Sequence, residues 1–270
     1  MIWTEELFKV KKPIISMLHL QPLPGDPKFA QGSSMKRVIE LARKDLHAIQ
    51  EGGVDGIIFS NEFSLPYQRH MSFVTPSAMA RVIGELMSEI RIPYGVDCIS
   101  DGLASIELAA AVDASFIRGT FSGVYVGDGG FYNNDFSDLV RRKHALGLDN
   151  LKMLYFLNPE SDVNLDSRQL SQIAKSLVFK AAPDALCISG SASGQGVDND
   201  LLAIVKKAVP DTLVFANTGC TVDTIVDKLK ICDAAVVATT FKFDGYLYNA
   251  VDISRVNAFM SKVTKFRTML

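Results

Sequence analysis

Short apolar segments, many of them rich in β-branched residues, recur along the chain and alternate with longer segments of helical periodicity. Several of the short segments are apolar at nearly every position, for example residues 55–59 and 234–238. Such runs are typical of strands that are buried on both faces, and therefore of a parallel sheet. The pattern predicts eight strands, at residues 14–20, 54–61, 92–100, 115–120, 152–158, 185–190, 213–218 and 234–241.

The spacing of these segments indicates the fold. Consecutive predicted strands begin about 31 residues apart on average, which is the length of one strand–helix unit. Four of the intervening helices have recognisable starts, with caps expected at Thr75-Pro76, Asp198, Thr221 and Asp252. Alternation of strand and helix indicates an α/β fold, and eight units predict a single (β/α)8 TIM barrel over residues 1–270. A doubly wound parallel sheet is the alternative that the pattern leaves open.

Composition excludes several classes of protein. The 270 residues carry 28 Lys and Arg against 30 Asp and Glu, a balance that argues against a nucleic-acid-binding protein. No apolar run reaches the ~18 residues that a membrane span needs, and the acidic segment 1–6 is unlike a signal peptide. The four cysteines form no C-x-x-C pair and are expected to be buried thiols. We therefore expect a cytoplasmic protein that binds neither nucleic acid nor membrane.

Two predicted loops, residues 21–33 and 121–134, are longer than a minimal connection from strand to helix. Both follow a strand, which places them at the C-terminal mouth of a barrel, where barrel enzymes carry their active sites. The second loop contains four glycines and several aromatic residues that we expect to be exposed. It is expected to be a mobile lid over the mouth, and an oligomer contact, in a homo-oligomer, is the alternative.

Loops rich in glycine and hydroxyl groups follow the last three predicted strands. Glycine turns let backbone N–H groups approach an anion, helix N-termini favour negative charge, and these loops often bind phosphate in barrels. The predicted phosphate ligands are Ser189, Gly190, Ser191, Ser193, Gly194, Asn217, Thr218, Gly219, Thr239, Thr240 and Lys242. The alternative is that these residues only make tight turns. The loops are not a P-loop, because no G-x-x-x-x-G-K-[ST] motif occurs.

Ionisable side chains gather near the ends of the first four predicted strands and in the loop that follows the fourth. The candidate catalytic residues are His19, Glu62, Asp97, Asp101, Arg118 and Asp128. A charge in an apolar strand is costly to bury unless it is paired, so Asp97 and Arg118 are either a structural ion pair or part of a site. His19 is likewise either a core histidine or a site residue. The carboxylates could also hold a divalent metal ion, and the cofactor stays unknown.

Absent motifs narrow the chemistry further. No lysine falls late in the first seven predicted strands, which argues against a Schiff-base aldolase. The chain contains no G-x-S-x-G, no H-E-x-x-H and no N-terminal dinucleotide-binding glycine motif. These absences argue against an α/β-hydrolase, a zinc protease and a Rossmann dehydrogenase.

Residues 17–27, in which a histidine precedes a Pro-Leu-Pro-Gly turn, resemble the first-strand signature of the BtpA family. Residues 53–58 match the second strand of that family. Further segments resemble its SgcQ-like branch in particular, at residues 59–67, 184–190, 216–219 and 238–242. The chain differs from the wider family after its third and fifth strands, where residues 98–101 and 155–160 replace more polar motifs.

The resemblance implies a barrel of the ribulose-phosphate-binding type with a phosphate site formed by the last three loops. Together with the residues above, it favours an enzyme of sugar metabolism that acts on a phosphorylated small molecule, as an isomerase, epimerase or lyase. The polar groups missing after the third and fifth strands favour an alternative. In that alternative, the barrel binds a phosphorylated ligand without catalysis and has an assembly or regulatory role.

Overall fold

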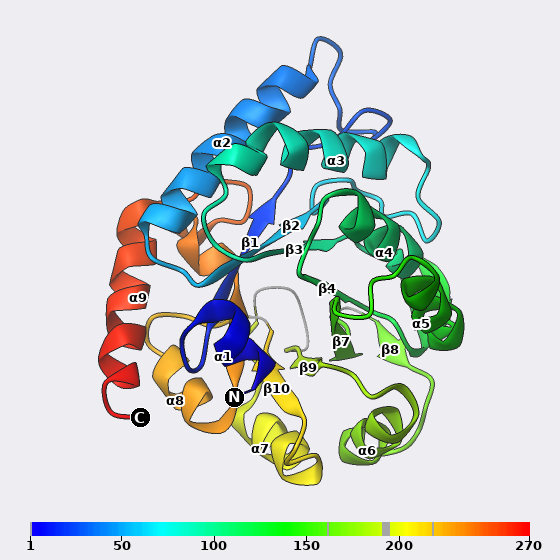
Figure 1. Cartoon of the computed structure of the whole chain (residues 1–270), viewed down its shortest axis with the longest axis vertical. Helices are drawn as coiled ribbons and strands as arrows, with labels where there is room; N and C mark the ends of the chain where they lie inside the picture. The colour runs from blue at the N-terminus through cyan, green and yellow to red at the C-terminus, as the bar shows by residue number, and fades with distance from the viewer. Residues whose placement is uncertain (1, 161, 191–194, 218) are drawn as a thin grey trace.

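Eight parallel strands close into a barrel in the computed structural model, which describes residues 2–160, 162–190, 195–217 and 219–270 (Figure 1). The order around the barrel is β1-β11-β10-β9-β7-β4-β3-β2, which confirms the predicted TIM barrel. The barrel strands are β1 (Ile14–His19), β2 (Gly56–Ser60), β3 (Tyr94–Asp97), β4 (Phe116–Gly119), β7 (Lys152–Asn158), β9 (Ala185–Ile188), β10 (Leu213–Ala216) and β11 (Ala234–Val237).

One helix follows each barrel strand and covers the outside of the barrel (Figure 1). These helices are α2 (Met35–Glu51), α3 (Val74–Leu86), α4 (Gly102–Ala111), α5 (Phe136–Ala145), α6 (Leu170–Ala181), α7 (Asn199–Ala208), α8 (Ile225–Ile231) and α9 (Ile253–Arg267). Within the described part of the chain, no helix has both the length and the apolar character that crossing a membrane requires.

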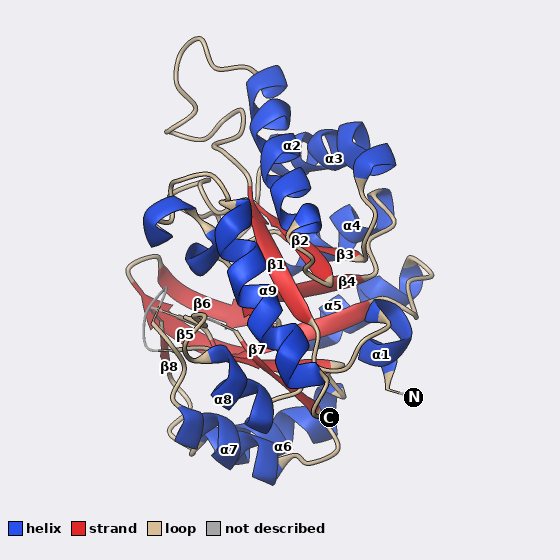
Figure 2. Ribbon diagram, turned by 90° about the vertical axis from the view of Figure 1, so that its left-hand side faces the viewer, coloured by secondary structure: helices blue, strands red, loops and turns tan. Residues whose placement is uncertain are grey.

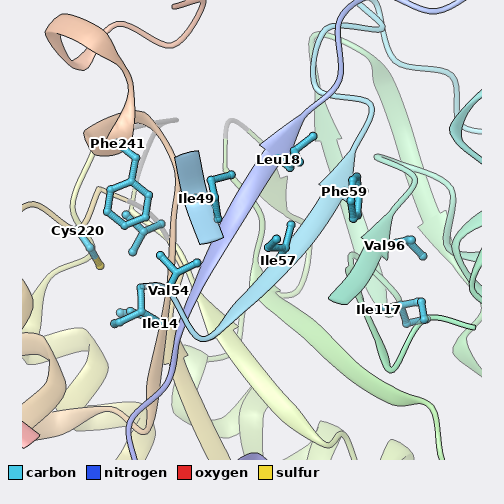
Figure 3. Packing of buried hydrophobic residues seen from close by; sticks show 14 of the residues in the cluster. Ile14, Leu18, Ile49, Val54, Ile57, Phe59, Val96, Ile117, Cys220 and Phe241 are labelled. Carbon is cyan, nitrogen blue, oxygen red and sulfur yellow. The ribbon is translucent and has the colours of Figure 1, made fainter. Parts of the chain in front are cut away.

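Alternate residues of the strands pack into two separate apolar layers, as the two-residue period of a strand requires. Outward-facing residues such as Leu18 and Phe59 join the helices, including Ile49 of α2, in the larger cluster (Figure 3). Inward-facing residues such as Met17 and Ile58 fill the barrel. Strands buried on both sides in this way explain why the sequence shows nearly continuous apolar runs.

A short N-terminal helix, α1 (Trp3–Phe8), closes the barrel at the end where the strands begin. Its Phe8 joins the interior cluster, and the ring contacts Phe116 edge-on at 5.7 Å between centroids. A Cβ on Gly56 would lie only 2.5 Å from the Phe8 ring, so the glycine leaves the space that this ring needs. The interior is therefore apolar at the bottom, and only the opposite end remains for polar chemistry.

The predicted long loop after β4 is instead a hairpin, formed by β5 (Gly123–Gly127) and β6 (Gly130–Asn134). The two-residue strand β8 (Val163–Asn164) pairs with β5 and completes a three-stranded antiparallel sheet. This sheet lies on the side of the molecule opposite α1 (Figure 2). Of its aromatic residues, Tyr125 and Tyr132 are buried and Phe131 is exposed. Phe121 is also buried, so the expected exposure holds for Phe131 and is wrong for Phe121, Tyr125 and Tyr132.

Two of the four predicted helix caps are confirmed. Asp198 caps α7 and Asp252 caps α9, each by accepting a hydrogen bond from a backbone N–H two residues on. The other two are wrong, because α3 begins at Val74, before Thr75, and α8 begins only after Thr224. Residues 221–224 form a turn in which Thr221 O accepts from the backbone of Thr224. A hydroxyl residue after a strand thus starts a turn as readily as a helix.

Candidate functional site

Inward-facing positions become polar at the C-terminal end of the barrel. Most of them lie one or two inward steps beyond an apolar residue of the interior cluster, as His19 lies beyond Met17, and Asp97 follows Gly95 in the same way. These polar residues, which we call the mouth layer, are His19, Ser60, Asp97, Arg118, Asn158, Ser189 and Asn217. All of them are buried except Asn158, which is half-buried. The barrel therefore brings together, in one layer, side chains from strands that are far apart in the sequence.

Arg118 lies at the centre of this layer. Its Nε and Nη2 donate to Asp97 Oδ2 at 3.0 and 2.8 Å, and its Nη1 donates to Asn217 Oδ1 at 3.0 Å. The guanidinium also lies over the ring of Phe156, 4.9 Å from its centroid. Burial raises the pKa of Asp97, whereas the charge of Arg118 lowers it. The two residues thus form the buried ion pair that one of the two interpretations predicts.

The hydrogen-bonded chain continues from Arg118 across the mouth. Asn217 Nδ2 donates to Ser189 Oγ at 3.0 Å. The backbone N–H of Ser189 donates to Asn158 Oδ1 at 3.1 Å, and Asn158 Nδ2 donates to Ser189 O at 2.8 Å. These bonds fix the ends of β3, β4, β10, β9 and β7 relative to one another. Such a satisfied polar network holds a site rigidly.

His19 and Glu62 form the second part of the site. Their Nε2 and Oε2 atoms are 3.7 Å apart. Burial, with the charges of Lys242 and Arg118, lowers the pKa of His19 well below its usual value, so the imidazole is neutral. Burial raises the pKa of Glu62 to about 7, helped by the negative charges of Asp97 and Glu160 and opposed by Arg118. A neutral imidazole beside a carboxyl group that titrates near neutrality is suited to proton transfer.

Two buried polar atoms in the mouth layer have no hydrogen-bond partner within the described ranges. They are His19 Nδ1 and Ser60 Oγ. Buried polar groups are usually paired, so these two atoms at the barrel mouth need a partner that the described residues do not supply. Sequence reasoning missed Ser60 and Asn158, although continuing the inward alternation of β2 and β7 by two residues would have found both.

Glu160 and Tyr67 also lie close to the site and were not predicted. The Tyr67 hydroxyl donates to the backbone oxygen of Glu62 at 2.9 Å. Burial and the charges of Glu62 and Asp97 raise the pKa of this hydroxyl. Both residues stand in loops after strands, where no periodicity distinguishes a site residue from a solvent-facing one.

The glycine-rich loops after β9 and β10 meet at the mouth. Gly190 and Gly219 are both in close backbone contact with residues 195–196. Of the remaining predicted phosphate ligands, Ser189 and Asn217 are buried in the mouth layer, and Thr239 and Thr240 are half-buried after β11. Four others, Ser191, Ser193, Gly194 and Thr218, lie outside the described residues.

A methyl group on Gly219 is expected to disrupt this junction. Gly219 has a φ of +61°, and a Cβ there would lie 2.1 Å from the backbone nitrogen of Gly196. Gly147 has a similar φ of +70° with nothing within 4 Å of its Cβ position, which makes it the matched control. We expect Gly219→Ala to lower the free energy of unfolding by about 3 kcal/mol and Gly147→Ala by about 1 kcal/mol. Denaturant unfolding measures both, and equal losses would contradict the close approach.

Lys242 does not serve the phosphate loops. Its ammonium is buried and lies 2.9 Å from Asp45 Oδ2 of α2, and Asp45 Oδ1 accepts from the backbone N–H of Val251 at 2.8 Å. This placement contradicts the prediction that Lys242 binds phosphate, because the charge is neutralised within the protein. The sequence could not show that a carboxylate 197 positions away takes this ammonium.

Lys242→Met is therefore expected to lower the free energy of unfolding rather than the affinity for phosphate. Removing one partner leaves the Asp45 carboxylate without its cation, which for a buried pair costs about 3–5 kcal/mol. Asp45 keeps its backbone donor and 12% side-chain exposure, so we expect a loss of about 2–3 kcal/mol. Adding Asp45→Leu should recover part of this loss in denaturant unfolding. A double variant that is less stable than the single one would contradict this account.

Two of the predicted catalytic carboxylates, Asp101 and Asp128, have surroundings other than the His19–Glu62 pair. Asp101 caps α4, accepting from Ala104 N at 3.0 Å, and its second oxygen accepts from Met71 N at 2.8 Å. Asp128 is exposed at the turn between β5 and β6. The structure thus does not bring these two into contact with His19 or Glu62: Asp101 accepts local backbone hydrogen bonds, and Asp128 faces solvent.

No group of three or more His, Cys, Asp and Glu side chains is arranged as a metal site in the described part of the chain. Two cavities of about 490 and 500 Å³ lie outside the mouth layer. The first lies between the hairpin and α6, and the second lies beside α1. Neither is lined by His19, Glu62 or Arg118, so the ionisable groups with shifted pKa values, and not the cavities, mark the candidate site.

Comparison with known proteins adds family relationships to this geometry. Residues 10–265 match the model of the BtpA family. The chain is 47% identical over 267 residues to the sgc region protein SgcQ of Escherichia coli, covering 99% of this chain and all of the relative. It is 27% identical over 263 residues to the photosystem I biogenesis protein BtpA of Synechocystis, covering 96% and 91% of the two chains.

Solved structures share the fold at much lower identity. The chain superposes on wild-type GGGPS from Thermoplasma volcanium with a TM-score of 0.60 at 13% identity, covering 100% and 99% of the two chains. The native KDPGal structure superposes with a TM-score of 0.59 at 15% identity, covering 100% of both chains. Phosphoribosyl anthranilate isomerase from Thermus thermophilus gives 0.57 at 10% identity, covering 94% and 98%.

Proposed function

Because the chain belongs to the BtpA family, we propose that it binds a phosphorylated sugar-like molecule at the barrel mouth. We propose further that it catalyses proton transfer to and from this molecule, as an isomerase, epimerase or lyase. The observation that carries this proposal is the His19–Glu62 pair. A neutral imidazole stands 3.7 Å from a carboxyl group whose pKa is about 7. Two such groups are what a reaction at a carbon next to a carbonyl group requires.

In this mechanism Glu62 is the base. Its ionised oxygen takes the proton from the carbon beside the carbonyl group, and the electron pair of that C–H bond moves toward the carbonyl oxygen. The neutral imidazole of His19 donates a hydrogen bond, and then a proton, to this oxygen. His19 takes a proton back from a hydroxyl group of the enediol as the product carbonyl forms, and Glu62 returns its proton to the substrate carbon, so no proton is gained or lost overall. Burial around both groups keeps bulk water from competing for these protons.

Arg118 and its partners position the substrate in the proposal. The charge of Arg118 lies near Glu62, as its effect on the pKa of that carboxyl group indicates. A cation there stabilises negative charge that develops on the substrate oxygens. The phosphate group would bind on the other side of the mouth, where Ser189, Gly190 and Gly219 bring a hydroxyl group and backbone close together.

The test is a panel of sugar phosphates with two readouts. Calorimetry measures binding, and NMR in deuterated water measures exchange of carbon-bound protons next to the carbonyl group. We expect at least one sugar phosphate to bind and to exchange a proton, and Glu62→Gln to slow this exchange by about a hundredfold or more without abolishing binding. Exchange at the wild-type rate in Glu62→Gln would contradict the mechanism, and failure of every sugar phosphate to bind would contradict the substrate class.

A second function is favoured by one relative. The Synechocystis protein is named for photosystem I biogenesis, which suggests an assembly role in that protein. In this chain, Arg118 is bonded to Asp97 and Asn217, an arrangement that also suits a rigid barrel without catalysis. Binding of a sugar phosphate with no proton exchange and no turnover would favour this second function.

A further inference from the structure

Arg69 attaches the hairpin after β4 to the loop after β2. Its Nη2 donates to the backbone oxygens of Gly129 and Gly130 at 3.1 and 3.0 Å. Its guanidinium carbon also lies 4.3 Å from the centroid of the Tyr132 ring, which is a stacked cation–π contact. These contacts hold the inner face of the hairpin against the loop that carries Glu62 and Tyr67.

This attachment leaves two polar groups enclosed and unsatisfied. The Tyr132 hydroxyl and Arg69 Nη1 are buried, and neither has a hydrogen-bond partner among the residues that the structure describes. Tyr132 as a whole is only 7% exposed. Neither group takes part in holding the hairpin, because the contacts use the ring of Tyr132 and the other nitrogens of Arg69. The two groups therefore need another explanation.

The Tyr132 hydroxyl and Arg69 Nη1 lie near the barrel mouth. Tyr132 shares the inward face of the hairpin with buried Tyr125, whereas Val126 and Phe131 face outward. Burial raises the pKa of Tyr132, and the charges of Asp97 and Asp101, at the end of β3, add to this effect. In the closed barrel β3 stands four strands from β10 in either direction, so this region faces the phosphate loops across the mouth.

We propose that the Tyr132 hydroxyl and Arg69 Nη1 form a subsite for the hydroxyl groups at the end of the ligand remote from its phosphate. Tyrosine both donates and accepts a hydrogen bond, and arginine donates, so together they match neighbouring hydroxyl groups. The carboxylates of Asp97, Asp101 and Asp162 nearby disfavour a second anion here and favour a neutral polyol end. This inference rests on the proposed function, because it takes the phosphate site as the opposite anchor.

Tyr132→Phe is the direct test, because it removes the hydroxyl group and keeps the ring on which Arg69 stacks. Calorimetry compares two probes, D-ribulose 5-phosphate and inorganic phosphate. We expect the variant to bind D-ribulose 5-phosphate about 5- to 20-fold more weakly and inorganic phosphate within about twofold of the wild type. The matched control is Tyr155→Phe, which removes an equally unpaired buried hydroxyl outside the barrel, beside Phe121, and should change neither affinity.

The outcomes separate the subsite from the proposed function and from a purely structural role. If inorganic phosphate does not bind the wild type, the phosphate site itself fails. If both probes bind and Tyr132→Phe leaves both affinities unchanged, only the subsite fails. Hydrogen exchange of residues 123–134 should be the same in Tyr132→Phe and the wild type. Faster exchange in the variant would show that the hydroxyl stabilises the hairpin, and would overturn the proposed ligand contact.

Discussion

Glu62→Gln is expected to lower kcat for proton exchange by about 10²- to 10⁴-fold, the usual contribution of a positioned general acid or base. Glutamine keeps the shape of the side chain and cannot accept a proton at the pH of the reaction. The dissociation constant of the substrate should change much less than kcat. Glu85→Gln removes an exposed carboxyl group of α3 and is the control, since it should leave kcat unchanged.

The pH dependence follows from the same group. Burial raises the pKa of Glu62 to about 7, so the fraction that is ionised, and with it the rate of proton abstraction by the free protein, should rise through pH 7. A plot of kcat/KM against pH should therefore show an ascending limb with a midpoint near 7. A limb near the usual glutamate pKa would contradict Glu62 as the base.

The free energy of unfolding should fall over the pH range in which the rate rises. A carboxyl group whose pKa is higher in the folded than in the unfolded state favours the folded protein when protonated, and this contribution is lost as pH rises from about 4.5 to about 7. At pH 8 the ionised group lowers stability by at most about 3 kcal/mol. Glu62→Gln should consequently be more stable than the wild type at pH 8 and similar at pH 4.5. Reduced stability of the variant at pH 8 would indicate a structural role for the carboxylate.

The strands and the closed barrel could be predicted because they depend on local patterns. A strand buried on both faces reads as an apolar run wherever it stands, and eight regularly spaced runs leave few alternatives. The hairpin at 123–134 was missed as secondary structure although its Asp-Gly turn, flanked by Val-Tyr-Val and Phe-Tyr, is a recognised hairpin signal. The glycines were interpreted as a sign of a mobile loop, and Gly127, Gly129 and Gly130 lie at the turn of the hairpin.

The site could be predicted only in part. Asp97, Arg118, His19 and Glu62 stand at strand ends, and the barrel brings strand ends together whatever the details. The roles of Lys242 and Asp101 depend instead on contacts with other segments of the chain. Lys242 pairs with Asp45, and Asp101 accepts from the backbone N–H of Met71. No spacing rule reveals such partners, because they are set by how a helix packs on the barrel.

Arg118→Met is expected to lower the free energy of unfolding by about 3–5 kcal/mol, because it leaves Asp97 buried at 2% exposure without its cation. Burial already raises the pKa of Asp97, and loss of Arg118 should raise it further. A carboxyl group with a raised pKa destabilises the folded state as it ionises, so the loss should be smaller at pH 5 than at pH 8. Denaturant unfolding at both pH values measures this difference.

Adding Asp97→Asn to Arg118→Met should recover most of this stability, because the uncompensated carboxylate is then gone. Equal losses in the single and double variants would show that Arg118 acts through Asn217 and Phe156 instead. The restored double variant also separates the two interpretations of this pair. If it folds stably and no longer binds D-ribulose 5-phosphate, the pair serves the ligand, whereas wild-type affinity would show that the pair only holds β3 to β4. Stability is removed as a variable in that comparison, so the affinity reports on the site alone.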